Sequence, residues 1–183
     1  MRKFVALFLP FILFGKSDAQ IYIADSCRIN FFSAAAVENI AAVNTVSKPI
    51  MNTASGEIEI SISNQEFIFK KKLMQEHFNE DYMESDKYPH TVFKGKVNEK
   101  IDYTKDGINN VTVTGTMDMH GVKKDITIPG TITIKDGKIK LKADFVAKLV
   151  DYNIKIPSVL GNNVAEQIAI SLTAGMKPYI VKK

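Results

Sequence analysis

The residues that could do chemistry are few: one cysteine, three histidines and a group of acidic side chains near the middle of the chain. Glu76 and Glu80 are spaced to lie one turn apart on a helix, and with His77 and Asp81 they form a candidate surface metal site. Exposed acidic residues on a helix are more often solvated or paired with lysines. We therefore expect no metal.

Nucleophilic catalysis would require Cys27, the sole cysteine, to lie beside His77, His90 or His120. No local motif supports such a pair, and the sequence contains no Gly-x-Ser-x-Gly elbow, phosphate-cradling glycine loop or Cys-x-x-Cys motif. His120 precedes Gly121 in a predicted turn, where a hydrogen bond to the backbone is the commoner role of a histidine. Cys27 is expected to be a small residue on a strand rather than a lipidated N-terminal cysteine. The sequence therefore predicts neither an enzyme nor a bound cofactor.

The dominant pattern is an alternation of apolar and polar residues with a period of two, which is typical of half-buried β-strands. About eight strands at hairpin spacing imply an all-β fold, either an antiparallel sandwich or a closed antiparallel barrel. The alternating runs cover residues 29–33, 58–69, 93–97, 111–119, 126–134, 139–145 and 168–176.

Glycines punctuate these runs in two ways. Asp106-Gly107, His120-Gly121 and Asp136-Gly137 fall between runs and predict hairpin turns, because glycine adopts a positive φ at no steric cost. The hairpin over residues 133–141 is the clearest of these. Inside the runs, glycine often marks a bend of the sheet, which favours the barrel over the sandwich. The glycines inside runs are Gly95, Gly115 and Gly130.

Residues 72–85 depart from the alternation. Met74, Phe78 and Tyr82 recur at i, i+4 and i+8, so this stretch predicts a short helix between two strands. Asn162-Asn163, before residues 164–168, predicts the start of a second helical turn with asparagine as its cap.

The N-terminus has the layout of a secretory signal peptide over residues 1–19. A short basic region precedes an apolar run over residues 4–14, and Ser17 and Ala19 then supply the small-x-small spacing of a signal peptidase site. The run is too short for a membrane span of about 20 residues. We expect cleavage after Ala19, which would leave one domain over residues 20–183 that does not span the membrane.

Charge and cysteine content limit the partners of the protein and the cellular compartment in which it acts. The net charge of the chain is +4, and removal of Arg2, Lys3, Lys16 and Asp18, which together carry +2, would leave about +2. Such a weak charge predicts no nucleic-acid partner. A single cysteine excludes an intramolecular disulfide, which suits a periplasmic or secreted protein of a bacterial envelope. The sequence leaves open whether the protein is a monomer or a homodimer.

Three blocks of the sequence resemble the YceI-like family. Residues 73–95 resemble its central signature, a leucine-led helical turn, an aromatic pair and Lys-Tyr-Pro before a strand with phenylalanine. Residues 113–124 resemble its Gly-x-Leu-x-x-x-Gly-x-x-(Lys/Arg) strand and hairpin, and residues 25–31 resemble its opening strand. The resemblance implies an exported, lipocalin-like antiparallel β-barrel with one or two short helices. It also implies a long amphiphilic chain, such as a polyprenyl quinone, held in an elongated apolar pocket.

The sequence departs from that family pattern at two places. Residues 34–48 form an alanine-rich run where the usual form has a compact strand of glycine and aromatic residues. Ser26-Cys27-Arg28 replaces the customary histidine near the first strand.

The inward phase of the strands and helix defines the candidate binding residues. Periodicity alone favours a packed core, since an eight-stranded barrel is either filled by side chains or holds one small ligand. The resemblance favours an isoprenoid, quinone or other lipid-like ligand; the alternative is a structural or interaction module with a packed barrel and no ligand. The predicted pocket residues are Phe31, Phe67, Phe69, Leu73, Met74, Phe78, Tyr82, Phe93, Met117, Met119, Ile128, Phe145, Leu149, Ile154 and Ile156.

Overall fold

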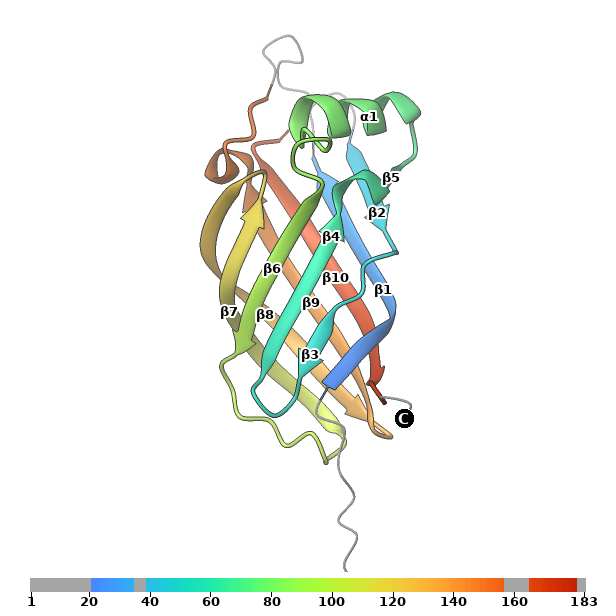
Figure 1. The fold of residues 1–183 in the computed structure, drawn as a ribbon, viewed down its shortest axis with the longest axis vertical. Coiled ribbons are helices and arrows are strands. Elements are labelled where there is room, and N and C mark those ends of the chain that lie inside the picture. Colours follow the sequence, from blue (N-terminus) through green and yellow to red (C-terminus); the bar gives the residue numbers. More distant parts are fainter. Residues whose placement is uncertain (1–20, 35–38, 157–164, 181–183) are drawn as a thin grey trace, which may run out of the picture.

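The alternating runs form the strands of a tall barrel with short helical segments at one end (Figure 1). The computed structural model describes residues 21–34, 39–156 and 165–180. The strands are β1 (Ile21–Ser33), β2 (Ile40–Asn44), β3 (Ile50–Asn52), β4 (Glu57–Ser63), β5 (Ile68–Phe69), β6 (His90–Val97), β7 (Gly107–Met119), β8 (Val122–Lys135), β9 (Lys138–Lys148) and β10 (Gln167–Pro178). The helical segments are η1 (Asn64–Glu66), α1 (Lys72–His77), the π-helical η2 (Phe78–Tyr82) and η3 (Leu149–Tyr152).

Eight of these strands close the barrel. β1 pairs antiparallel with β10 along most of its length, from Tyr22 opposite Pro178 to Phe32 opposite Ala169. From β10 the ring continues through β9, β8, β7, β6, β4 and β3 and returns to β1, and every neighbouring pair is antiparallel. The predicted lipocalin-like all-β barrel is therefore confirmed.

The wall gains two short strands near the helical segments. β3 pairs with the start of β1, whereas β2 pairs with its end, from Ile29 to Ser33. β5 then pairs with β2, at Ala42 with Phe69 and Val43 with Ile68. We call the end of the barrel that carries α1 the helix end. At this end β2 and β5 lie on the side of β1 that β3 occupies at the other end.

Side chains fill the half of the barrel away from the helices. In β9, Ile139 and Leu141 are buried while Lys138 and Lys140 between them are exposed, as the alternation predicts. The tightest part of this packed half contains side chains that are at most 2% exposed. They are Met51, Ile132, Ile134, Ile139 and Met176.

Two of the three predicted hairpin turns are present. His120-Gly121 and Asp136-Gly137 have φ values of 53° and 74° and of 51° and 71°, the positive pair that a tight two-residue hairpin needs. The prediction for Asp106-Gly107 is wrong, because residues 98–106 form a longer connection and Gly107 already begins β7. Ile101 and Tyr103 in this connection pack against the core, which explains why the chain does not turn tightly.

The predicted helix between two strands is confirmed as α1 and its continuation η2, which lie between β5 and β6. The alanine-rich run of residues 34–48 contains β2. The predicted signal peptide over residues 1–19 and the helical start at Asn162-Asn163 lie outside the described residues. Among the helices that the structure describes, none is both long and apolar enough to cross a membrane.

The strand glycines mark close contacts between neighbouring backbones. Gly95 of β6 faces Gly115 of β7, and a Cβ atom added to Gly115 would lie 2.2 Å from the carbonyl oxygen of Lys94. A Cβ atom on Gly130 would lie 2.5 Å from the carbonyl oxygen of Lys142. No real side chain tolerates such distances, so glycine at these positions allows the strands to bend and approach.

Replacement of Gly115 by alanine should therefore destabilise the barrel. We expect Gly115→Ala to lower the free energy of unfolding by about 1–3 kcal/mol, measured by chemical denaturation. Gly107→Ala is the matched control, because a Cβ atom there meets nothing within 4 Å. It should change stability by no more than about 0.5 kcal/mol. Equal effects of the two variants would contradict the close-contact explanation.

Candidate functional site

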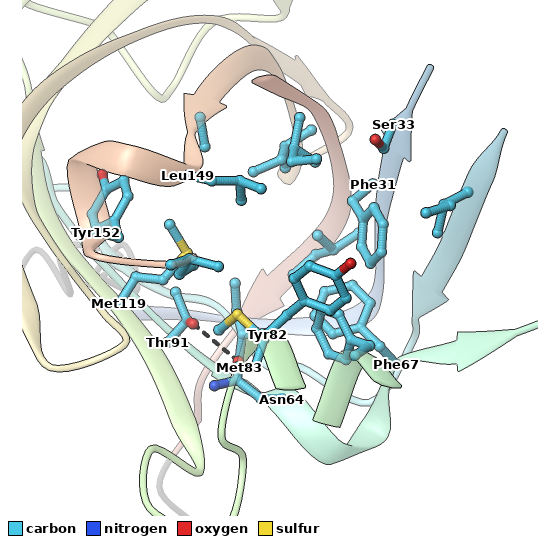
Figure 2. Close-up of a pocket in the computed structure, with 18 of the residues that line it drawn as sticks. Phe31, Ser33, Asn64, Phe67, Tyr82, Met83, Thr91, Met119, Leu149 and Tyr152 are labelled. Carbon is cyan, nitrogen blue, oxygen red and sulfur yellow. Dashed lines mark hydrogen bonds between the residues drawn. The ribbon is translucent and has the colours of Figure 1, made fainter. Parts of the chain in front are cut away.

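The helix end of the barrel contains a cavity of about 330 Å³ (Figure 2). It lies above the packed half, and residues from β1, β2, β4, β5, β6, β7, β9 and β10 reach it together with α1, η2 and η3. Its volume falls near the lower end of the range of about 300–1,000 Å³ found for small-molecule sites. The interior is thus packed at one end and hollow at the other.

Four phenylalanine rings form one wall of the cavity. Phe31 comes from β1, Phe67 and Phe69 from the segment at β5, and Phe78 from η2. The ring centroids of the contacting pairs lie 5.1–5.6 Å apart, and Phe31 and Phe78 are stacked with an interplanar angle of 23°. Such offset or edge contacts are the favourable geometries for aromatic pairs. Through Phe78, these contacts connect η2 to the barrel wall.

Methionine and other apolar residues form the opposite wall. Met117 and Met119 come from β7, Phe145 and Ala147 from β9, and Leu149 from η3. Methionine has an unbranched, polarizable side chain that adapts to irregular shapes. This wall therefore suits an apolar guest without dictating a single shape for it.

The lid consists of α1 and η2, and its register decides which residues face inward. Met74, Phe78 and Tyr82 line the cavity, whereas Leu73 is 61% exposed. At η2 the backbone widens into a π-turn, in which the Met83 amide donates to the Phe78 carbonyl oxygen at 2.9 Å. Met83 thus lines the cavity next to Tyr82 and is only 6% exposed. Helical spacing alone gives no signal for this extra inward residue.

Buried polar groups at the edge of the cavity are satisfied by one another. The Asn64 side-chain amide donates to the Tyr88 carbonyl oxygen at 2.7 Å, and the Thr91 hydroxyl donates to the Asn64 side-chain oxygen at 2.9 Å. Asn64 is 1% exposed, so loss of either partner would leave a buried polar group unpaired. These bonds hold the start of β6 against the end of β4.

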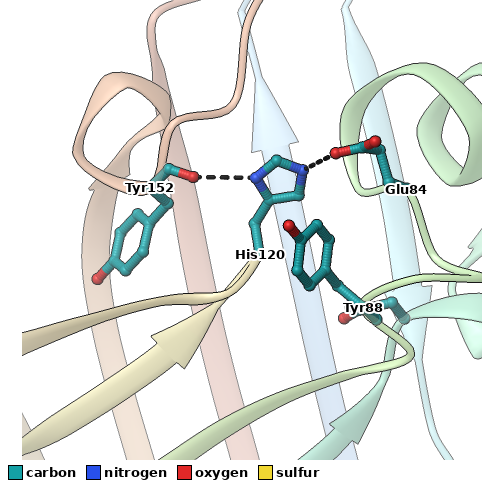
Figure 3. Close-up of polar contacts among 5 residues, drawn as sticks. Glu84, Tyr88, His120 and Tyr152 are labelled. Atoms are coloured by element: carbon teal, nitrogen blue, oxygen red, sulfur yellow. Dashed lines mark hydrogen bonds and ion pairs between the residues drawn. The ribbon is translucent and has the colours of Figure 1, made fainter.

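His120 connects the two segments that cover the cavity (Figure 3). Its Nε2 lies 2.8 Å from a carboxylate oxygen of Glu84, just after the lid, and its Nδ1 lies 3.0 Å from the carbonyl oxygen of Tyr152 in η3. Each ring nitrogen thus faces an oxygen atom, one from each of the two segments. The Tyr88 ring packs on the imidazole with centroids 4.6 Å apart.

Two of the three blocks that resemble the YceI-like family therefore meet in space. Tyr88 belongs to the Lys-Tyr-Pro block, and His120 with Gly121 belongs to the strand-and-hairpin block. A Cβ atom on Gly121 would lie 2.6 Å from the Tyr88 ring, so glycine there leaves room for the aromatic contact. The role predicted for His120, a turn residue bonded to the backbone, agrees with its contact to the Tyr152 carbonyl oxygen.

The other candidate chemical residues are separated or paired. Cys27 on β1 is 7% exposed, and burial raises the pKa of its thiol to about 11. His77 lies 2.6 Å from the Asp81 carboxylate, and Glu76 lies 3.8 Å from the Lys72 amine. Within residues 21–34, 39–156 and 165–180, no group of three or more His, Cys, Asp or Glu side chains is placed to hold a metal ion.

Most predicted pocket residues lie on the cavity wall, although their role in binding stays a prediction. Those that line the cavity are Phe31, Phe67, Phe69, Met74, Phe78, Tyr82, Met117, Met119, Phe145, Leu149 and Ile154.

The other four predicted residues lie off the wall. Leu73 points away from the barrel on the exposed side of α1. Phe93 is buried in the core, and its ring lies over Gly95, where a Cβ atom would come within 2.6 Å of it. Ile128 is buried in the same cluster as Phe93, and Ile156 follows Ile154 at the edge of the described segment without lining the cavity.

Several wall residues were not predicted. Ile168 and Ile170 belong to the alternating run of the last strand, so their inward phase was a usable signal. Ser33 shares the inward phase of Ile29 and Phe31, so its position was also indicated. Asn64 lies in η1 and Thr91 precedes the predicted run that starts at residue 93, so neither carries such a signal. The unpredicted residues that line the cavity are Ile29, Ser33, Ile40, Ile62, Asn64, His77, Met83, Thr91, Ala147, Tyr152, Ile168 and Ile170.

The fold and the cavity define a class, the lipocalin-like antiparallel β-barrel with an apolar space under a helical lid. A family model of the YceI-like domain matches residues 24–176, and the chain belongs to this family. The resemblance inferred from the sequence is thereby confirmed. A search of curated proteins finds no match.

Solved structures share this fold at low sequence identity. A polyisoprenoid binding domain from Saccharophagus degradans, implicated in plant cell wall breakdown, superposes with a TM-score of 0.75 at 15% identity, covering 86% of this chain and 98% of that one. BcnA from Burkholderia cenocepacia superposes with a TM-score of 0.69 at 15% identity, covering 81% and 95%. A YCEI protein from Campylobacter jejuni gives a TM-score of 0.50 at 18% identity, covering 96% and 98%.

The raised pKa of Cys27 predicts an unreactive thiol. With a pKa of about 11 instead of 9, the reactive thiolate should be about a hundredfold scarcer at pH 8 than for a free cysteine. We expect the folded protein to react with Ellman's reagent at pH 8 at least that much more slowly than the protein in guanidinium chloride. Rapid reaction in the native state would contradict the burial of Cys27.

The bridge made by His120 predicts a loss of stability when the ring is removed. His120→Asn preserves a residue that tolerates the positive φ but cannot span Glu84 and Tyr152. We expect a destabilisation of about 1–3 kcal/mol in urea unfolding. Asp136→Asn is the control, since it occupies the same position of the exposed hairpin and should change stability by less than about 0.5 kcal/mol. A His120→Asn variant as stable as the control would show that the bridge does not hold the lid.

Proposed function

We propose that this protein holds one long apolar or amphiphilic chain, a polyisoprenoid, quinone or other lipid, in the cavity at the helix end and performs no reaction on it. The observation that carries the proposal is the cavity itself, walled by phenylalanine, methionine, leucine and isoleucine side chains. Membership of the YceI-like family supports it, as does the fold shared with the polyisoprenoid binding domain of Saccharophagus degradans.

The energetics favour such a ligand. Burial of a five-carbon isoprene unit gains roughly 3–4 kcal/mol at about 0.8 kcal/mol per carbon. Association costs about 4–15 kcal/mol, so several buried carbons must offset this cost before binding becomes tight. A cavity of about 330 Å³ therefore suits a short chain, or one end of a longer chain.

We also propose that the protein acts after export, in the periplasm or outside the cell. Support comes from the sequence of residues 1–19, with its basic start, short apolar run and small-x-small site. An aqueous compartment beside a membrane is where a water-insoluble chain needs a carrier.

Native mass spectrometry tests both proposals on protein purified from the envelope of its own cells. We expect a polypeptide that begins at Gln20 and an additional mass that is released by organic solvent and identified as a lipid. Protein that starts at Met1 would contradict export. Protein that carries no lipid, and that takes up no polyprenol or quinone when offered, would contradict binding and favour a module that acts through its surface.

A matched pair of variants locates the bound molecule. Ala147 faces the cavity and is 8% exposed, whereas its neighbour Val146 faces outward and is 58% exposed. Ala147→Phe should fill the cavity and weaken farnesol binding at least tenfold. The affinity is measured from the displacement of a fluorescent lipid probe by farnesol, with no background from tryptophan because the chain has none. Val146→Phe should leave binding unchanged. Melting curves of both variants check the fold, and equal binding by the two folded variants would place the ligand outside the cavity.

A further inference from the structure

The cavity contains one polar atom with no partner. Among the described residues, the hydroxyl oxygen of Tyr82 is the single buried side-chain oxygen or nitrogen atom without a hydrogen bond. Tyr82 lies on η2 in the lid, and Figure 2 shows its ring reaching in beside Phe31. A buried polar group left unpaired is unfavourable, and natural proteins leave few of them. The Tyr82 hydroxyl would therefore be stabilised by a hydrogen-bond partner from outside the chain.

Four other polar side chains at the cavity already have partners within the chain. Asn64 and Thr91 bond to each other and to the backbone, and the Ser33 hydroxyl oxygen accepts from the Ala165 amide at 3.1 Å. His77 at the lid is paired with Asp81. Among the described residues, the Tyr82 hydroxyl is thus the fully buried side-chain group that a polar atom of a bound molecule would satisfy.

The chemistry of the wall restricts what that partner is. The tyrosine pKa is raised, first by burial and second by the nearby Asp81 carboxylate, so the hydroxyl stays protonated at neutral pH and can donate. No lysine or arginine lines the cavity among the described residues. A phosphate or diphosphate group would be buried there without a counter-charge, which is strongly unfavourable. A neutral oxygen acceptor meets no such penalty.

We propose that Tyr82 is a specificity-determining residue whose hydroxyl donates a hydrogen bond to a neutral oxygen, a carbonyl, ether or hydroxyl, at the end of the bound chain. The oxygenated end then lies under the lid and the hydrocarbon lies against the phenylalanine and methionine walls. This inference rests on the proposed lipid-binding function and deepens it. It distinguishes neutral oxygenated chains from pure hydrocarbons and from phosphorylated chains.

Three ligands that carry the same farnesyl chain test the inference: farnesylacetone with a ketone, the hydrocarbon of equal length in which a methylene group replaces that carbonyl, and farnesyl phosphate. We expect wild-type protein to bind the ketone most tightly. Tyr82→Phe should weaken ketone binding about five- to tenfold and leave binding of the hydrocarbon unchanged. Tyr103→Phe serves as control, because Tyr103 lies in the connection at the other end of the barrel and should alter neither affinity.

Infrared spectroscopy gives a second readout that a purely structural role would not move. With carbon-13 at the ketone, the carbonyl stretch should fall to lower frequency in the wild-type complex and return to the value for an unbonded ketone in Tyr82→Phe. Unliganded Tyr82→Phe should melt no lower than wild type, because the lost hydroxyl has no partner in the protein.

The outcomes separate the two proposals. If none of the three ligands binds wild-type protein, the proposed function fails. If ketone and hydrocarbon bind equally, or if Tyr82→Phe leaves their ratio and the carbonyl frequency unchanged, lipid binding stands and the role of Tyr82 is overturned. Tightest binding of farnesyl phosphate would also overturn it.

Discussion

The antiparallel pairing of β1 with β10 is the interaction on which the rest of the structure depends. It joins the first and last strands, which are separated by almost the whole chain, and leaves no open edge in the ring of eight strands. Closure turns one face of every strand inward, so apolar residues that alternate along the sequence meet in a common interior. The register of this pairing also sets the height at which Phe31 and Ile170 face each other at the helix end.

Closure by eight strands leaves an interior that side chains can fill, and in the half around Met51 and Ile132 they do. The other half contains the cavity, and its wall is built differently. β2 and β5 lie beside β1 there, and Phe78 of the lid packs against Phe31 of β1. The same barrel is therefore packed with side chains at one level of its axis and hollow at another.

Alternation and turn residues predicted the antiparallel strands, because both depend on local backbone geometry. The glycines inside strands favoured the barrel over a sandwich, and the family resemblance implied it. The turn residues failed where longer-range packing decides: Asp106-Gly107 is no hairpin, since Ile101 and Tyr103 draw the connection onto the core. The same limit applies to the site. Phe93 and Met117 lie opposite each other on β6 and β7, yet the Phe93 ring lies over Gly95 whereas Met117 reaches the cavity. Period two separates inward from outward residues but carries no information on the direction that an inward side chain takes. The π-turn that adds Met83 to the lid has no sequence signal in a helical pattern.

The polar groups of the described residues around the cavity fall into two kinds, those bonded to the chain and the unpaired hydroxyl of Tyr82. Three polar side chains form their hydrogen bonds within the chain, those of Asn64, Thr91 and His120. These bonds hold β6, the lid and η3 in position around the opening. Apolar walls alone would accept any hydrophobic chain of suitable size, because hydrophobic burial is non-directional. A single donor in dry surroundings adds direction, since an unpaired hydroxyl there is costly and a paired one is not. In our proposal, the polar residues that hold the frame in position are thus distinct from Tyr82, which selects the ligand.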